Sequence, residues 1–268
     1  LPFGSYYIKE LQAPDGFVSS DEIIEVIVSY QGQDVEVVRL KEIFKNQPTT
    51  VEFTKSDLTT GVELDGATLT VFDKDGNEID KWTSVKGEPH IIKRLHVGET
   101  YTLREEFAPY GYLKAEEVEF TITDTAEIQK VEMKDEVPIG RIIINKKGEF
   151  LSEVTWNDMV AGAMDSIWDY VTGSLKDVTF EIYAREDIKA ADGESDDYYK
   201  KDELVATITT DELGFARSDD LPLGKYYVVE KETANGFVLD GEPRDIDLTY
   251  RDQDTPVVTY DSEWQNSR

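Results

Sequence analysis

The sequence predicts an all-β protein built from tandem β-sandwich repeats. One stretch occurs three times: a glutamate, then Gly six residues later, then an aromatic residue, with Glu10, Glu105 and Glu230 as the glutamates. Short segments that alternate apolar and polar residues lie between turns at regular spacing, and few stretches have helical spacing. Because a repeat this specific sets the domain count, we expect two complete repeats and one incomplete one.

The repeated stretch, called the glutamate box below, places its glutamate on an apolar strand face. At two-residue steps before each glutamate stand an aromatic and an aliphatic residue: Tyr6 and Ile8, Tyr101 and Leu103, Tyr226 and Val228. Since the strand period is two, these side chains and the glutamate share one face. A carboxylate that points into a core is costly unless it is paired or protonated. A cost repeated three times indicates a function.

The first repeat, residues 1–48, contains a box and two further segments with strand character, at residues 23–28 and 35–40. Pro48 marks its end, because proline cannot continue a central strand. We expect these residues to be the C-terminal part of a domain, cut from a longer chain, because no lysine-bearing strand precedes Glu10. We therefore expect that they do not close as a sandwich on their own and that a missing half completes them.

The second repeat, residues 49–138, reads as a complete domain. Its strands are expected at residues 51–55, 67–72, 101–105, 117–122 and 131–135. The acidic run at residues 73–78 lacks the twelve-residue pattern and closing glutamate of a calcium loop, so we interpret it as a hairpin turn and expect no metal site.

The third repeat, residues 139–268, is longer because it carries an insertion near residues 152–175. Strands are expected at residues 142–146, 178–184, 204–208, 226–230 and 257–266. Within the insertion, apolar residues recur at helical spacing: Trp156, Met159, Ala163, Ile167, Trp168 and Val171. We expect a helix over residues 157–171, capped by Asn157 and packed on its own domain through Met159, Ile167 and Val171. A helix that binds a partner is the alternative.

The composition excludes several kinds of partner. The chain has 57 acidic and 28 basic residues, for a formal net charge of −29. Nucleic acids and anionic membranes need basic surfaces, so neither is expected to bind. There is no cysteine, and hence no disulfide. No apolar run is long enough for a transmembrane helix, no signal peptide is visible, and no cofactor motif is found.

A second pattern closes each repeat: a large apolar residue, any residue, then Asn or Asp, which gives Asn46, Asp135 and Asn266. The two-residue step places the amide or acid on the apolar face. In the complete repeats the first strand also carries a lysine on its apolar parity. This is Lys55 in the second repeat and Lys146 in the third, with the adjacent Lys147 as the alternative.

Each complete repeat is thus expected to aim a lysine, a glutamate and an Asn or Asp into one core. Burial lowers the pKa of an amine and raises that of a carboxyl, which favours a nucleophilic amine and a proton-carrying acid. Such an amine forms an amide with a carboxamide, releasing ammonia, or with a protonated acid, releasing water. Held in place, the groups need no separate enzyme. A buried ion pair beside a hydrogen-bonded Asn is the alternative interpretation.

These boxes, first-strand lysines and terminal Asn or Asp residues resemble those of tandem collagen-adhesin B-type (CnaB) domains. Such domains, also called SpaA-like or prealbumin-like, form Ig-like β-sandwiches in the rod-shaped surface adhesins and pilins of Gram-positive bacteria. The resemblance covers essentially the whole chain. It implies spontaneous isopeptide bonds, Lys55 to Asp135 with Glu105 as catalyst and Lys146 to Asn266 with Glu230. Two departures stand out: Asp135 where Asn is commoner, and a third box without proline.

The resemblance implies an extracellular, cell wall-anchored stalk that holds a binding tip away from the cell and contacts neighbouring domains of its own chain. The alternative function is a binding module that grips a host protein or glycan, with Trp156 and Trp168 as the place to look. A glycosidase is not expected, because each box glutamate is paired with a lysine instead of a second acid. We therefore expect no enzymatic activity beyond self-crosslinking.

Overall fold

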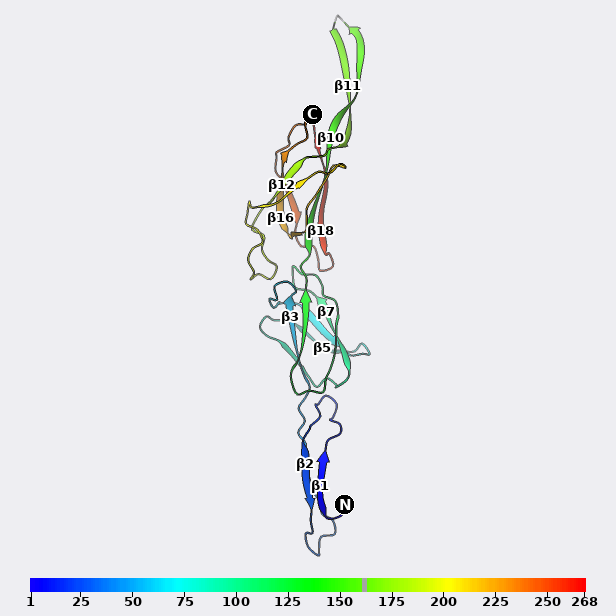
Figure 1. Ribbon diagram of the computed structural model, residues 1–268, viewed down its shortest axis with the longest axis vertical. Coiled ribbons are helices and arrows are strands. Elements are labelled where there is room, and N and C mark those ends of the chain that lie inside the picture. Colours follow the sequence, from blue (N-terminus) through cyan, green and yellow to red (C-terminus); the bar gives the residue numbers. More distant parts are fainter. Residues whose placement is uncertain (161–162) are drawn as a thin grey trace. The chain divides into compact units, whose positions relative to one another are not determined.

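The computed structural model describes residues 1–160 and 163–268, and the side chains of residues 1–155 and 166–268 (Figure 1). Within these ranges every regular element is a β-strand, which confirms the all-β prediction, and there is no helix that could cross a membrane. The chain divides into two compact units. Unit 1 holds Leu1–Pro109 and Lys114–Asp135, and unit 2 holds Tyr110–Leu113 and Glu136–Arg268.

Residues 1–48 of unit 1 contain one two-stranded antiparallel sheet, β1 (Gly4–Lys9) and β2 (Ile23–Val28), in which Tyr6 lies opposite Val26. The strand predicted at residues 35–40 is wrong, since these residues pair with no other strand. In the complete repeats the last strand pairs with the first strand. Within residues 1–48, which are all described, no first strand is present to pair with the segment that contains Asn46. Tyr7 and Ile27 consequently remain exposed.

The rest of unit 1 is a sandwich of two sheets. In the smaller sheet β3 (Thr50–Asp57) lies between two other strands, and four strands make the larger sheet. The partners of β3 are β6 (His90–Lys93) and β9 (Gln129–Asp135); the larger sheet runs β5 (Glu78–Thr83), β4 (Thr68–Phe72), β7 (Thr100–Phe107), β8 (Val118–Thr121). Alternate residues of β3 point inward, so Val51, Phe53 and Lys55 are all buried in the core.

Unit 2 is a second sandwich, organised by one long strand, β10 (Ile139–Val160). Four strands pair with β10, and four others form the facing sheet. The partners are β11 (Ala163–Ser174), β14 (Phe215–Arg217), β15 (Leu221–Pro222) and β18 (Val257–Asn266); the facing sheet runs β13 (Leu204–Thr209), β12 (Thr179–Ala184), β16 (Gly224–Glu232), β17 (Arg244–Leu248). Aromatic and branched side chains fill the core between the two sheets, with Phe180 packed edge-on against Trp264.

The helix predicted over residues 157–171 is wrong. Its described backbone belongs to β10 and β11, which form an antiparallel hairpin that Figure 1 shows running beyond the two sheets of its unit. The expected inward side chains Ile167 and Val171 are 48% and 54% exposed, whereas those of Met159 and the cap Asn157 lie outside the described residues. Residues 167, 169 and 171 also fit a strand period. Pairing with β10 supplies the backbone N–H and C=O groups with the hydrogen bonds that a helix would otherwise supply.

Candidate crosslinking sites

In both complete repeats the first and last strands pair in parallel, and this pairing sets the position of each site. Lys55 of β3 lies opposite Met133 of β9, and Asp135 follows two residues later. Lys146 of β10 likewise lies opposite Trp264 of β18, two residues before Asn266. Since side chains two residues apart share a face, each lysine and its acceptor point into the same core.

The repeat-2 site consists of Lys55, Glu105 and Asp135, whose side chains are all fully buried. Lys55 Nζ lies 3.0 Å from Glu105 Oε1 and donates a hydrogen bond to Asp135 Oδ1. The other carboxylate oxygen of Glu105 accepts a hydrogen bond from the backbone N–H of Ala115 at 2.7 Å. Glu105 is therefore held in place by the backbone while its free end contacts the lysine.

The two carboxyl groups of the repeat-2 site share one cation. Burial raises the pKa of Asp135 to about 7, with the charge of Lys55 opposing the shift and Glu105 adding to it. A substantial fraction of Asp135 is therefore protonated at neutral pH. A protonated acid is the form that an amine attacks to make an amide with loss of water.

The repeat-3 site has the same parts in a different arrangement. Glu230 bridges the other two residues: Lys146 Nζ donates to its Oε2 and Asn266 Nδ2 donates to its Oε1, both at 2.6 Å. The side chains of Lys146 and Glu230 are fully buried. One carboxylate thus holds the amine and the carboxamide side by side, where it is able to pass a proton between them.

The surroundings of Lys146 favour the neutral amine. Burial lowers the pKa of Lys146, with Arg244 adding to the shift and Glu230 opposing it. Lys147, the alternative nucleophile, points elsewhere, and its Nζ donates to Ser174 Oγ at 3.4 Å. The structure therefore places Lys146, and not Lys147, against Glu230.

Residues 1–48 bring Glu10 and Asn46 together without a lysine. Asn46 Nδ2 donates to Glu10 Oε2 at 2.6 Å, the separation also found between Asn266 and Glu230. The backbone N–H of Ser20 donates to the same Glu10 oxygen at 2.7 Å. Ser20 follows Glu10 by ten residues, as Ala115 follows Glu105, so the backbone contact that holds the box glutamate also recurs.

Sequence reasoning missed two groups of the repeat-3 site. Asn266 Nδ2 also donates to Thr233 Oγ1 at 2.8 Å. Thr233 stands at the box position occupied by Ala108 in repeat 2 and Ala13 in repeat 1. A polar residue at a position that is otherwise alanine could therefore have indicated from the sequence that Thr233 belongs to the site. Arg244, whose guanidinium lies over the Trp264 ring at 4.3 Å, gave no such signal, because only the fold brings β17 to the site.

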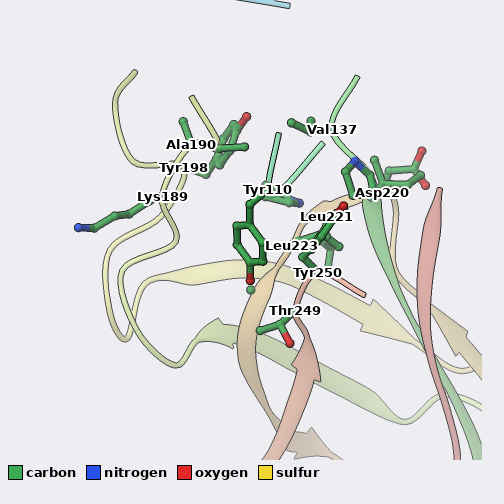
Figure 2. Close-up of a pocket in the computed structure, with 16 residues that line it drawn as sticks. Tyr110, Val137, Lys189, Ala190, Tyr198, Asp220, Leu221, Leu223, Thr249 and Tyr250 are labelled. Carbon is green, nitrogen blue, oxygen red and sulfur yellow. The ribbon is translucent and has the colours of Figure 1, made fainter. Parts of the chain in front are cut away.

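The described residues contain no cluster of side chains suited to a metal ion. In the turn at residues 73–78, Asp73 instead accepts hydrogen bonds from the turn itself, including the backbone N–H of Asn77 at 2.8 Å. Unit 2 also has a cavity of about 480 Å³, shown in Figure 2, where the rings of Tyr110 and Tyr250 pack edge to face. No residue of the crosslinking sites lines this cavity.

Among solved structures, one with the same overall fold is the Bacillus anthracis TIE protein. It matches all of this chain with 25% sequence identity and a TM-score of 0.56. This chain covers 43% of that protein, so it spans less than half of its length. The shared fold is therefore that of part of a larger protein.

Two pilins are also similar, at lower scores. A streptococcal ancillary pilin matches all of this chain with 16% identity and a TM-score of 0.30, over 76% of its own length. BcpA, the major pilin subunit of Bacillus cereus, matches 82% of this chain with 13% identity and a TM-score of 0.31, over 99% of its length. No curated protein matches the sequence.

A family model settles the relationship at the level of sequence. The model of the SpaA prealbumin-like fold domain matches twice, at residues 49–137 and 168–264. Together the two matches cover more than half of the chain, and each contains a glutamate box with the residues that surround it. The chain belongs to the SpaA family of prealbumin-like fold domains.

Proposed function

We propose that this chain is a structural shaft segment of a bacterial surface adhesin or pilin, in which each complete repeat crosslinks itself through an isopeptide bond. The observation that carries the proposal is the buried lysine, glutamate and Asn or Asp that join the first and last strands of both repeats. A purely structural ion pair would not require the same three roles at the same strand positions twice.

In the repeat-2 site the reaction forms a bond between Lys55 Nζ and the side-chain carbonyl carbon of Asp135. The C–O bond of the protonated acid breaks, and its hydroxyl leaves as water with one proton from the amine. Glu105, 3.0 Å from Nζ, carries that proton from the amine to the leaving oxygen. Proximity supplies much of the rate, since both partners are held in one dry core.

In the repeat-3 site Lys146 Nζ attacks the side-chain carbonyl carbon of Asn266. The C–N bond of the carboxamide breaks, and ammonia leaves with one proton from the amine. Glu230 contacts both nitrogens at 2.6 Å and is the group that relays this proton. The chemistry acts on the chain itself, so the proposal includes no external substrate and no enzyme activity beyond self-crosslinking.

A covalent bond between the first and last strands suits a shaft. Lys55 and Asp135 are 80 residues apart, and a crosslink closing a loop of that size stabilises a fold by about 4–5 kcal/mol in the chain-entropy model. The chain has no cysteine, so disulfides do not supply this stability. The resemblance to surface adhesins supports an extracellular, wall-anchored location, with neighbouring domains of the same parent protein as its contacts.

Intact mass spectrometry of the purified chain tests the proposal. We expect a mass below the sequence value by one water and one ammonia, with crosslinked peptides containing Lys55 with Asp135 and Lys146 with Asn266. A Lys55→Ala variant should regain only the water, which assigns each loss to its site. A native protein with the full sequence mass would refute the crosslinks.

The second candidate function is a binding module, which one observation favours. Trp168 is 53% exposed on the β10–β11 hairpin, with Ile167, Tyr170 and Val171 exposed beside it. Exposed apolar side chains that gather in one place are typical of an interaction site, whereas single scattered ones are common on any surface. The side chain of the other expected residue, Trp156, lies outside the described residues.

A further inference from the structure

The outer part of the β10–β11 hairpin has no third strand. β18 pairs with β10 only as far as Gly148, and β14 only as far as Asn145. Beyond Gly148, the described part of β10 pairs with β11 alone, so residues 149–160 and 163–172 form a two-stranded ribbon, as Figure 1 shows. A ribbon of two strands is marginally stable in water, and each strand keeps one edge of unpaired backbone groups.

Both faces of the ribbon carry exposed apolar side chains, and one face also carries a pair of acidic residues. Its register places Leu151 opposite Tyr170 and Val154 opposite Trp168, which makes one face apolar and aromatic. On the other face Glu153 lies directly opposite Asp169, between the pairs Phe150–Val171 and Thr155–Ile167. Like charges in that position destabilise a pair of strands.

Part of the ribbon lies outside the two family matches. The two family matches leave out residues 138–167, which include all of the ribbon contributed by β10. The sandwich core of unit 2 is built mainly from residues outside the ribbon, although Phe150 at its base packs against Phe237 with ring centres 5.3 Å apart. Closure of the sandwich therefore does not explain the exposed part of the ribbon.

The charge of the ribbon indicates which kind of partner it would bind. Residues 149–174 contain five acidic residues and no Lys, Arg or Pro, although lysine and proline are the residues that commonly protect a free strand edge. The whole chain carries a formal net charge of −29, so a second copy would be repelled. Charge complementarity selects a basic partner.

We propose that the ribbon binds an extended basic segment of another protein, which adds to the free edge of β11 as a further strand. In that position alternate side chains of the segment reach opposite faces of the ribbon. Apolar residues would cover Trp168 and Tyr170, and Lys or Arg residues would lie beside Asp169, on the face that also carries Glu153. The preferred sequence thus alternates apolar and basic residues. This inference rests on the second candidate function and not on the crosslinks.

The test uses the whole chain and a synthetic peptide of the length of β11, 12 residues, alternating Val or Tyr with Lys. Binding is measured by calorimetry, and hydrogen exchange locates the site. We expect protection of the β11 amides and weaker binding at higher salt. A peptide with Glu in place of Lys, and one N-methylated along the edge that would pair with β11, should bind at least about tenfold more weakly.

Variants of the ribbon complete the test. Trp168→Ala should weaken binding at least about fivefold, and the double variant Glu153→Gln, Asp169→Asn should weaken it about fivefold. The matched control, Asp219→Asn with Glu242→Gln, removes two exposed charges outside the ribbon and should bind like the parent chain. Melting curves confirm that each variant is folded, and the intact mass of the same samples reports the crosslinks separately.

Three results would overturn the proposal: no measurable binding of the basic peptide, equal binding of the acidic peptide, or ribbon variants that bind like the control. Self-association of the chain that the ribbon variants abolish would also overturn it, because the occupant would then be a second copy. Loss of the crosslinks with retained peptide binding would refute the first proposed function and leave this one standing.

Discussion

The side-chain amide of Asn46 donates a hydrogen bond to Glu10 at 2.6 Å, and no lysine pairs with Glu10 among the described residues. The same bond joins Asn266 to Glu230, where Lys146 completes the group. Repeat 1 therefore holds an acceptor and a proton carrier in the geometry of a complete repeat. Both residues are half-buried, because nothing described covers the open side of the sheet.

We predict that repeat 1 reacts with a first strand supplied as a peptide. The peptide of residues 139–146 carries the lysine of repeat 3 and should add to the chain covalently, with loss of one ammonia from Asn46. Mass spectrometry after incubation detects the adduct. The same peptide with Met in place of its lysine should give none, and Glu10→Ala should abolish the reaction. An adduct located at any residue other than Asn46 would contradict the prediction.

The two complete repeats should react independently. Glu105→Ala should restore the water lost in repeat 2, and Glu230→Ala the ammonia lost in repeat 3, because each glutamate contacts the lysine of its own repeat and not that of the other. Each variant should lose about 4–5 kcal/mol of unfolding free energy through the missing crosslink. Glu106→Ala and Glu232→Ala are matched controls. A full mass loss in either box variant would show that its glutamate is not the catalyst.

The choice between the adjacent lysines is also testable. Lys146→Arg should abolish the ammonia loss, because arginine is a long side chain of similar reach without a nucleophilic amine. Lys147→Arg should leave it unchanged, since the Lys147 side chain contacts Ser174 and not Glu230. Peptide mapping of both variants gives the answer. The reverse pattern would assign the bond to Lys147.

The repeat-2 reaction should be sensitive to pH. The pKa of Asp135 is raised to about 7, so the fraction of protonated, reactive acid falls as pH rises through that value. The protein is obtained unfolded from synthesis, before the bond has formed, and is then refolded at each pH. We expect the loss of water to be faster at about pH 6 than at about pH 8.5. An Asp135→Asn variant is the control, because it releases ammonia instead of water. Intact mass at successive times measures the rate. A faster reaction at high pH would contradict this assignment.

The same raised pKa predicts how stability depends on pH before the bond forms. The folded state binds a proton on Asp135 that the unfolded state, with a pKa near its ordinary value, releases above about pH 4. Uncrosslinked repeat 2 should therefore lose stability as pH rises from about 4 to about 7. Urea unfolding of freshly refolded chain, read before the mass falls, measures this slope. A rising stability over that range would contradict it.

Much of both sites was readable from the sequence, because the strand period assigns residues to a face. The parity of Lys55 with Val51 and Phe53 was enough to place it in the core, and the same holds for Lys146. The period does not tell a ribbon from a helix where the apolar residues satisfy both spacings, as in residues 163–174. Contacts made across sheets, such as Arg244 over Trp264, depend on the tertiary fold and leave no local pattern.

The parallel pairing of first and last strands has a consequence for how the chain lengthens under load. With the proposed bond in place, a force applied to the ends of repeat 2 passes along β3 to Lys55, through the isopeptide bond to Asp135, and out of the repeat. The 80-residue loop between the two residues therefore bears no load and is not extended. Without the bond, that loop would add roughly 270 Å of contour at about 3.4 Å per residue. A crosslinked shaft is then an inextensible tether, whereas an uncrosslinked shaft would unfold under load and dissipate energy as it lengthens.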